Sequence, residues 1–197
     1  MLNEKLKNRH IILASGSPRR QDFFKNLGLD FEIRLKDIEE IYPPELTHYQ
    51  ISDYLAELKS LPFIKELTDK DILVTSDTIV WHKDTALGKP KDNDEAFAML
   101  KSLSNDTHEV ITSICIRTKA YKKTVNAVTK VTFKAFTDKE LWHYITTYSP
   151  LDKAGAYGIQ EWIGQVGVIS MEGSYFNVMG LPTHLLYETL NIIADDY

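Results

Sequence analysis

The chain has 197 residues, of which 43% are hydrophobic and 26% are charged, proportions typical of a folded globular protein rather than a disordered one. Its formal net charge of −5 argues against a broad nucleic-acid-binding surface, which requires a basic face. Its single cysteine, Cys115, excludes an intrachain disulfide and a zinc site built from several thiolates. Every apolar run is well short of the about 20 residues that a membrane-spanning helix needs. We therefore expect a soluble protein inside the cell.

Strand and helix signals alternate in the first part of the chain. An apolar run at residues 10–15 predicts a buried strand, and Pro18 fits the first turn of a helix that continues to Leu27. A second strand is expected at residues 31–35, followed by an acidic loop at residues 37–46. Cys115 lies in a later apolar run, where we expect it to be a buried core thiol.

Three pairs of residues have the spacing of a capping box, in which a polar residue is followed three positions later by Glu or Gln. They are Thr47 with Gln50, Asp92 with Glu95, and Thr137 with Glu140. Each pair precedes apolar residues at helical spacing and therefore predicts the start of a helix. A terminal helix is expected from Pro182 and Thr183 onward.

The remaining apolar runs predict strands. Two segments are expected at residues 71–76 and 78–82, and two long strands at 107–118 and 124–136 form a hairpin. A second hairpin is expected from residues 166–171 and 174–179. The alternation of strands and helices predicts an α/β fold.

The segment from Ser15 to Arg20 combines features that bind phosphate. A strand ends, Gly16 allows a tight turn, and a helix begins whose free backbone N–H groups and positive dipole end favour an anion. Hydroxyl groups and the guanidinium groups of Arg19 and Arg20 add further donors. The alternative is an ordinary helix cap with solvated arginines. A P-loop is excluded, because Gly88-Lys89 is followed by Pro90 rather than by Ser or Thr.

Carboxylates that could work on such a substrate occur in two places. Asp77 is expected at the end of an apolar strand, where it could hold a divalent metal or deprotonate a water. Glu39 and Glu40 offer a second carboxylate for Mg²⁺ or Mn²⁺. A turn or N-cap role for Asp77 and a surface role for the glutamates remain as alternatives.

Three further residues could contact a nucleotide. Lys59 and Lys89 could neutralise phosphate charge, although a solvated surface role is common for any single lysine. Gln160 ends a segment rich in small residues, and its amide could donate to and accept from a base edge. The alternative is a tight loop packed under a sheet.

Five segments, taken in order, resemble the motifs of the Maf family of nucleotide pyrophosphatases: residues 13–20, 76–80, 88–90, 152–160 and 173–182. The resemblance spans almost the whole chain. It implies a single domain, residues 1–197, in which an α/β architecture with a long mixed sheet and flanking helices forms two lobes around a central cleft. It also implies a homodimer.

The resemblance assigns roles to individual residues. Asp77 matches the catalytic carboxylate, described in the family as a proton acceptor. The positions that match the triphosphate and metal site are Ser15, Arg19, Arg20, Glu40, Lys59 and Lys89. Glu40 and Asp77 would hold the metal, Mg²⁺ or Mn²⁺, and Glu39 is the close competitor of Glu40.

The family has two main substrate branches, and the substrate-specificity positions match the one that resembles a dTTP and UTP pyrophosphatase. These positions are Arg19, Thr78 and Gln160. The resemblance therefore implies hydrolysis of dTTP and UTP to the monophosphate and pyrophosphate. A 7-methyl-GTP pyrophosphatase and a non-catalytic nucleotide-binding regulator of cell division remain as alternatives. Two departures from the family pattern are Ser76, where alanine is usual, and Glu161-Trp162, which replace a glycine-rich continuation.

Overall fold

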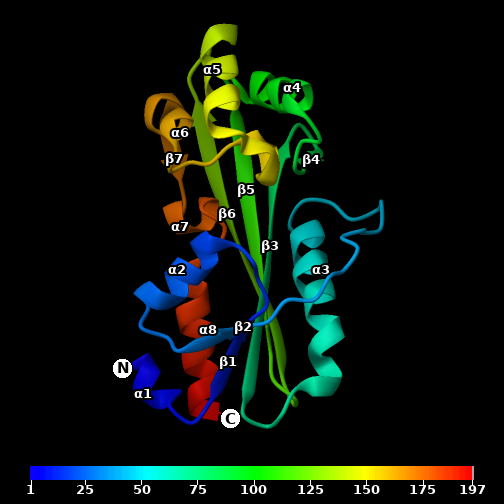
Figure 1. Cartoon of the computed structure of the whole chain (residues 1–197), viewed down its shortest axis with the longest axis vertical. Helices are drawn as coiled ribbons and strands as arrows, with labels where there is room; N and C mark the ends of the chain where they lie inside the picture. The colour runs from blue at the N-terminus through cyan, green and yellow to red at the C-terminus, as the bar shows by residue number, and fades with distance from the viewer. Residues whose placement is uncertain (197) are drawn as a thin grey trace. The chain divides into compact units, whose positions relative to one another are not determined.

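The computed structural model describes residues 1–196, which form a seven-stranded mixed sheet with helices packed against it (Figure 1). The strand order is β2-β1-β3-β5-β6-β7, and β4 pairs with β3 beside this path. Strand β1 pairs in parallel with β2 and β3, whereas the β3–β4 and β6–β7 pairs are antiparallel. The expectation of an α/β fold with a mixed sheet and flanking helices is confirmed.

The strands are β1 (His10–Leu13), β2 (Phe31–Ile33), β3 (Asp71–His82), β4 (Thr85–Leu87), β5 (Thr107–Arg117), β6 (Lys122–Phe133) and β7 (Val168–Glu172). The α-helices are α1 (Leu2–Lys5), α2 (Pro18–Asn26), α3 (Tyr49–Ser60), α4 (Asn93–Leu103), α5 (Asp138–Tyr148), α6 (Trp162–Gly167), α7 (Tyr175–Val178) and α8 (Thr183–Asp196). Short 3-10 helices are η1 (Leu61–Glu66), η2 (Pro150–Asp152) and η3 (Ala154–Ala156). None of the helices within residues 1–196 combines the length and apolarity that crossing a bilayer requires.

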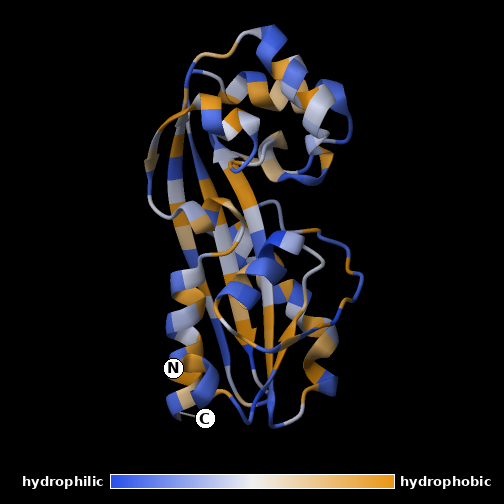
Figure 2. Cartoon of the chain, turned by 60° about the vertical axis from the view of Figure 1, so that its left-hand side comes forward, coloured by the Kyte–Doolittle hydropathy of each residue, from blue (hydrophilic) through white to orange (hydrophobic). Residues whose placement is uncertain are grey.

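The chain divides into two compact units, and strands β3, β5 and β6 contribute residues to both. The first unit consists of Met1–Asp77, Thr112–Ala127 and Gly180–Tyr197, and the second of Thr78–Ile111 and Val128–Met179. In the first unit, α1 and α8 lie side by side and are joined by an ion pair between Lys5 and Asp195 (Figure 1). Hydrophobic and hydrophilic bands alternate along α8 (Figure 2), as its helical periodicity predicts.

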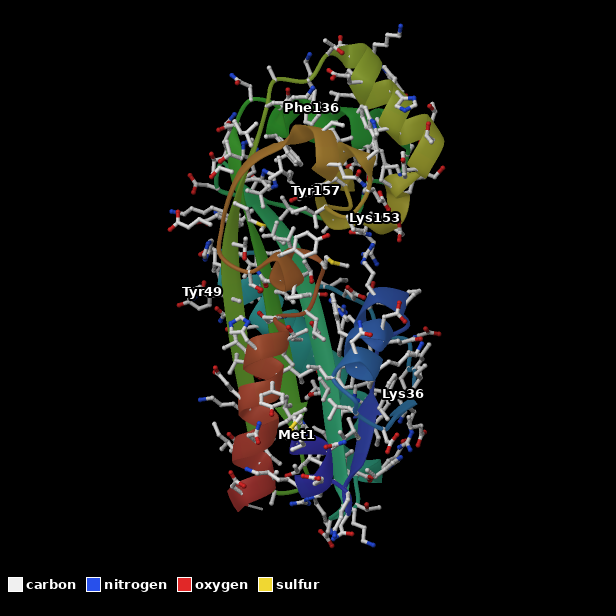
Figure 3. All side chains as sticks on the ribbon, turned by 90° about the vertical axis from the view of Figure 1, so that its left-hand side faces the viewer. Met1, Lys36, Tyr49, Phe136, Lys153 and Tyr157 are labelled. Carbon is white, nitrogen blue, oxygen red and sulfur yellow. The ribbon has the colours of Figure 1, made fainter. Side chains whose placement is uncertain are left out.

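Each unit has its own apolar core. In the first unit, Ile12 of β1 and Leu73 of β3 pack with Phe63 and Leu67. The predicted core position of Cys115 is confirmed, because its side chain is fully buried. The core of the second unit is rich in aromatic residues and packs helices α4, α5 and α6 together. Its labelled members in Figure 3 are Phe136 and Tyr157.

Two predictions from the sequence are wrong in detail. Asp77 does not end a strand, because β3 continues through it and pairs with β4 from Val80 to His82. The segment after Gly173 is the helix α7 rather than the second arm of a hairpin, because the Ser174 hydroxyl accepts the backbone N–H of Asn177 as a helix cap. Strand β7 instead pairs with β6. The short helices α1 and α6 give no strong periodic signal and are missing from the predictions.

Candidate functional site

The turn between β1 and α2 places three of the predicted phosphate-binding residues in the first unit. Ser15 is 8% exposed, and its hydroxyl accepts the backbone N–H of Ser17 at 3.3 Å. Pro18 begins α2, whose first residues carry no side-chain cap. The Nε atom of Arg19 is buried and has no hydrogen-bond partner among residues 1–196. An unpaired buried guanidinium donor at a helix N-terminus is suited to an incoming anion.

Arg20 has a different setting from Arg19, because main-chain oxygens hold it. Its Nε donates to the carbonyl of Gly180 at 2.8 Å, and its Nη1 donates to the carbonyl of Ser76 at 2.9 Å. Burial lowers the pKa of Arg20, and the nearby Asp77 carboxylate opposes that shift. Arg20 therefore ties α2 to the segment just before α8 and to β3, and it places a positive charge beside Asp77.

Asp77, Lys59 and Glu40 form a charge cluster in the first unit. The Nζ atom of Lys59 on α3 lies 2.5 Å from Oδ1 of Asp77 and 3.1 Å from Oε2 of Glu40. The Asp77 side chain is 9% exposed and that of Glu40 is 46% exposed. Glu39 makes no ion pair or hydrogen bond within the described part of the chain, so of the two glutamates it is Glu40 that pairs with Lys59.

Burial sets the proton affinity of Asp77. Desolvation raises the pKa of this carboxyl above its usual value, Lys59 and Arg20 oppose the rise, and Glu40 adds to it. A buried carboxylate with a raised pKa is a better proton acceptor than an exposed aspartate, as a general base requires.

The donor set of this cluster fits a hard divalent cation in part. Asp77 and Glu40 present carboxylate oxygens, the ligands that Mg²⁺ and Mn²⁺ prefer, and one cationic group already bridges them. Among residues 1–196 there is no group of three or more His, Cys, Asp or Glu side chains that could hold a metal ion. Mg²⁺ usually keeps several waters and takes substrate phosphates as ligands, so two carboxylates are a sufficient protein contribution.

The remaining predicted site residues, Lys89, Thr78 and Gln160, belong to the second unit. Lys89 is exposed in the loop that follows β4, and the preceding carbonyl of Gly88 accepts the backbone N–H of Gly155 at 3.0 Å. This bond joins the loop of Lys89 to the segment that ends at Gln160. Thr78 is half-buried on β3, directly after Asp77.

Gln160 lines a hollow of about 360 Å³ in the second unit. The other lining residues come from the adjoining chain, α6, β7 and α7: Ile159, Gly164, Gln165, Val168, Met171 and Tyr175. The side-chain amide of Gln160 makes no hydrogen bond to any other residue of 1–196. The main-chain carbonyl of Gln160 accepts a hydrogen bond from the Gln165 side-chain amide at 3.4 Å. A free amide in a hollow with mostly apolar walls is the kind of site that orients a small planar ligand.

Comparison with known proteins adds to this geometry. A profile of the family described as Maf-like protein matches residues 10–193. The chain belongs to the Maf-like family. Within curated proteins, it is 62% identical over 194 residues to the dTTP/UTP pyrophosphatase of Flavobacterium johnsoniae, a match that covers 98% of this chain and 100% of the relative. It is 52% identical to the dTTP/UTP pyrophosphatase of Christiangramia forsetii, covering 96% of this chain and 97% of the relative.

Among solved structures, the Ham1 protein of Staphylococcus aureus has a similar fold. The TM-score is 0.54, with 16% sequence identity, and the match covers 94% of this chain and 100% of that protein. At this identity the likeness concerns the fold alone. The Maf-like chain thus shares its architecture with a protein whose sequence is very different.

The Maf-like motif of residues 152–160 depends on residues that the sequence analysis did not assign. Gly158 donates its backbone N–H to the hydroxyl of Tyr144, at 3.0 Å, and the hydroxyl of Tyr157 lies 2.7 Å from Nε2 of His108. Tyr144 and His108 lie in an amphipathic helix and a buried strand, so their spacing indicates only core positions. Their polar contacts depend on the tertiary fold and have no sequence signature.

Proposed function

We propose that this Maf-like chain is a nucleoside triphosphate pyrophosphatase that hydrolyses dTTP and UTP to the nucleoside monophosphate and pyrophosphate. The names of its relatives support the substrate class. The observation that carries the chemistry is the buried carboxylate of Asp77, which lies beside the cations of Lys59 and Arg20. A carboxylate of raised pKa can accept a proton from an attacking water, and the neighbouring cations can bind an anionic substrate.

In the reaction proposed, Asp77 accepts a proton from a water molecule as the oxygen of that water attacks the α-phosphorus. The bond between the α-phosphorus and its bridging oxygen breaks, and that oxygen leaves with the pyrophosphate. Arg19, Lys59 and Lys89 bind the phosphates, and the hydroxyl of Ser15 donates to them. Arg20 serves chiefly to hold the phosphate-binding turn and to keep Asp77 in a positive field, as its main-chain bonds indicate.

Glu40 and Asp77 would hold the divalent cation, Mg²⁺ or Mn²⁺, that this family resemblance implies. When bound, the cation would neutralise charge on the triphosphate. Lys59 bridges the same two carboxylates, so its ammonium is expected to move toward the phosphates when cation and substrate are both present.

We propose that Gln160, Thr78 and Arg19 select the pyrimidine. The amide of Gln160 supplies one donor and one acceptor, which matches the carbonyl and N–H groups on the edge of uracil and thymine. The hollow of about 360 Å³ that Gln160 lines is at the lower end of the volumes usual for small-molecule sites.

The test is pyrophosphate release from UTP, dTTP, CTP, 7-methyl-GTP and ATP with Mg²⁺ or Mn²⁺. Rapid release from UTP and dTTP is expected. Asp77→Asn should lower kcat by about 10²- to 10⁴-fold, the usual contribution of a general base. Release chiefly from 7-methyl-GTP would contradict the selection by Gln160, and full turnover by Asp77→Asn would contradict the role of Asp77.

Two adjacent glutamates provide a matched control. Glu40→Gln should weaken the dependence of turnover on divalent cation, because it removes one of the two proposed carboxylate ligands. Glu39→Gln changes the same charge one residue away, at an exposed side chain that makes no ion pair or hydrogen bond within residues 1–196, and should behave as the wild type. Equal effects of both variants would show that Glu40 has no specific role.

We also propose that the chain acts in the cytoplasm, where nucleoside triphosphates are found, and that it forms a homodimer, as the family resemblance implies. Its acidic net charge of −5 supports the proposal that it does not bind nucleic acid. Light scattering coupled to gel filtration would measure the mass in solution, and a monomeric mass of 22.6 kDa would contradict the dimer.

A further inference from the structure

Glu161 follows Gln160 directly and stands where a helix cap is expected. It is the N-cap of α6, yet its side chain makes no capping hydrogen bond. The carboxylate instead lies against α5, where its Oε2 accepts the hydroxyl of Tyr144. Its Oε1 lies 3.4 Å from Nζ of Lys153. The role of this side chain is therefore not explained by capping.

Tyr144 links this carboxylate to the backbone of the same segment. Its side chain is fully buried, and its hydroxyl accepts the backbone N–H of Gly158 at 3.0 Å while it donates to Glu161. Burial first, and then the bond to Glu161, raise the pKa of Tyr144, so the hydroxyl remains protonated and able to donate. Gly158 lies two residues before Gln160, and Glu161 lies one residue after it. A single hydroxyl thus holds the chain on both sides of Gln160.

Lys153 closes the network at the start of the segment. Its side chain, labelled in Figure 3, is only 9% exposed. Its Nζ pairs with the exposed carboxylate of Asp152 at 2.7 Å and with Glu161. A buried ammonium group requires such partners, because removing one leaves a poorly compensated charge. Glu161 therefore fixes both ends of residues 153–160.

The glycines of the segment show how closely this packing is fitted. A Cβ atom on Gly158 would lie 2.9 Å from the carboxyl carbon of Glu161, and one on Gly164 would lie 1.9 Å from the carbonyl oxygen of Ile159. Gly155 has φ +67, a conformation that favours glycine. The backbone around Gln160 has little room to move while Glu161 faces inward.

We infer that Glu161 and Tyr144 are positioning residues that set the orientation of Gln160 and thereby the preference for the pyrimidine base. This inference rests on the proposed function, in which Gln160 reads the base. It assigns a purpose to Glu161, whose side chain does not cap α6.

The first measurement is independent of catalysis. Amide hydrogen exchange of residues 153–161 is compared in the wild type, Tyr144→Phe, Glu161→Gln and the control Tyr148→Phe. Tyr148 stacks on Tyr144 with ring centroids 5.1 Å apart and is 37% exposed, so its variant changes the same ring system without touching the network. Faster exchange is expected in the first two variants alone. Unchanged exchange in Tyr144→Phe would overturn the inference whatever the enzyme hydrolyses.

The second measurement is selectivity, taken as the ratio of kcat/KM for UTP to that for CTP. Tyr144→Phe should lower this ratio by about three- to tenfold, the effect of one lost buried hydrogen bond, mainly through a higher KM for UTP. Glu161→Gln keeps an acceptor for Tyr144 and should have a smaller effect. In a Gln160→Ala background, Tyr144→Phe should change the ratio no further, because both substitutions act through one amide.

The outcomes separate the two proposals. A wild type that prefers UTP and dTTP, combined with a Tyr144→Phe variant of unchanged selectivity, would overturn the positioning role and leave the proposed function intact. If Tyr144→Phe lowered the selectivity equally in the wild type and in the Gln160→Ala background, the positioning role would also be overturned. The Tyr144 hydroxyl would then affect selectivity through a residue other than Gln160. A wild type that hydrolyses no nucleotide would overturn the proposed function, and the selectivity role with it.

Discussion

At the scale of single residues, two neighbours on β3 show how differently a buried polar group can be accommodated. Asp77 has two cations beside it, Lys59 and Arg20. Ser76 is 1% exposed, and its Oγ has no hydrogen-bond partner among the described residues. An unpaired buried hydroxyl destabilises a fold, because it loses its hydrogen bonds to water and gains none in return.

Ser76→Ala is therefore expected to raise the free energy of unfolding by about 1 kcal/mol, because it removes a desolvated hydroxyl and little volume. Urea denaturation monitored by circular dichroism measures the change. Ser113→Ala is the matched control, since that buried hydroxyl donates to Oδ1 of Asp53 at 2.6 Å and lies 2.7 Å from the hydroxyl of Ser52. The control should lose stability. A loss of the same size in Ser76→Ala would mean that its hydroxyl has a partner in solution.

At the scale of elements, three capping-box pairs that look equivalent in the sequence have different structures. Thr137 and Glu140 form the complete box at the start of α5, with the Thr137 N–H donating to Glu140 at 2.7 Å. Asp92 caps α4 by accepting the backbone N–H of Glu95. Thr47 does not cap α3 at all, because the N-cap is His48, with φ 53.

These differences predict unequal effects of equal substitutions. Thr137→Ala should destabilise the protein by about 1 kcal/mol, the typical effect of losing an N-cap side chain. Thr47→Ala should cost less than half of that, because the Thr47 hydroxyl only donates to the exposed Gln50 side chain, at 3.3 Å, and the backbone N–H bond to the same oxygen is retained. Both threonines are exposed, so burial does not bias the comparison. Thermal unfolding of the two variants measures the difference, and equal shifts in Tm would contradict the assignment of the caps.

The same elements show how far the sequence alone predicts this fold and site. Local signals were enough for β1, α2, α4, α5 and α8, since apolar periodicity and caps depend on neighbouring residues. They failed after Gly173, where Ser174 caps a helix and Asn177 is buried against Val110 and Thr129, contacts that depend on the tertiary fold. Likewise, only the fold brings Glu40 rather than Glu39 to Lys59, and only the fold joins Glu161 to Tyr144.

At the scale of the whole molecule, a buried histidine of the second unit, His108, links global stability to pH. His108 is 2% exposed, its Nε2 lies 2.7 Å from the Tyr157 hydroxyl, and its Nδ1 has no partner within residues 1–196. Burial lowers the pKa of His108 to about 3, with a further lowering by His82 and an opposing effect of Asp106. An unfolded histidine titrates near 6.5. Between these two values the unfolded state binds a proton that the folded state does not.

The free energy of unfolding should therefore fall as the pH falls below about 6.5, with a contribution from His108 of up to about 1.4 kcal/mol per pH unit. His108→Gln cannot take up this proton in either state, so its stability should decline less steeply between about pH 6.5 and pH 4.5. Urea denaturation at several pH values gives both slopes. His184→Gln removes an exposed histidine and should retain the slope of the wild type. Parallel declines in the wild type and His108→Gln would mean that His108 is already protonated in the folded protein, with its ring in contact with water.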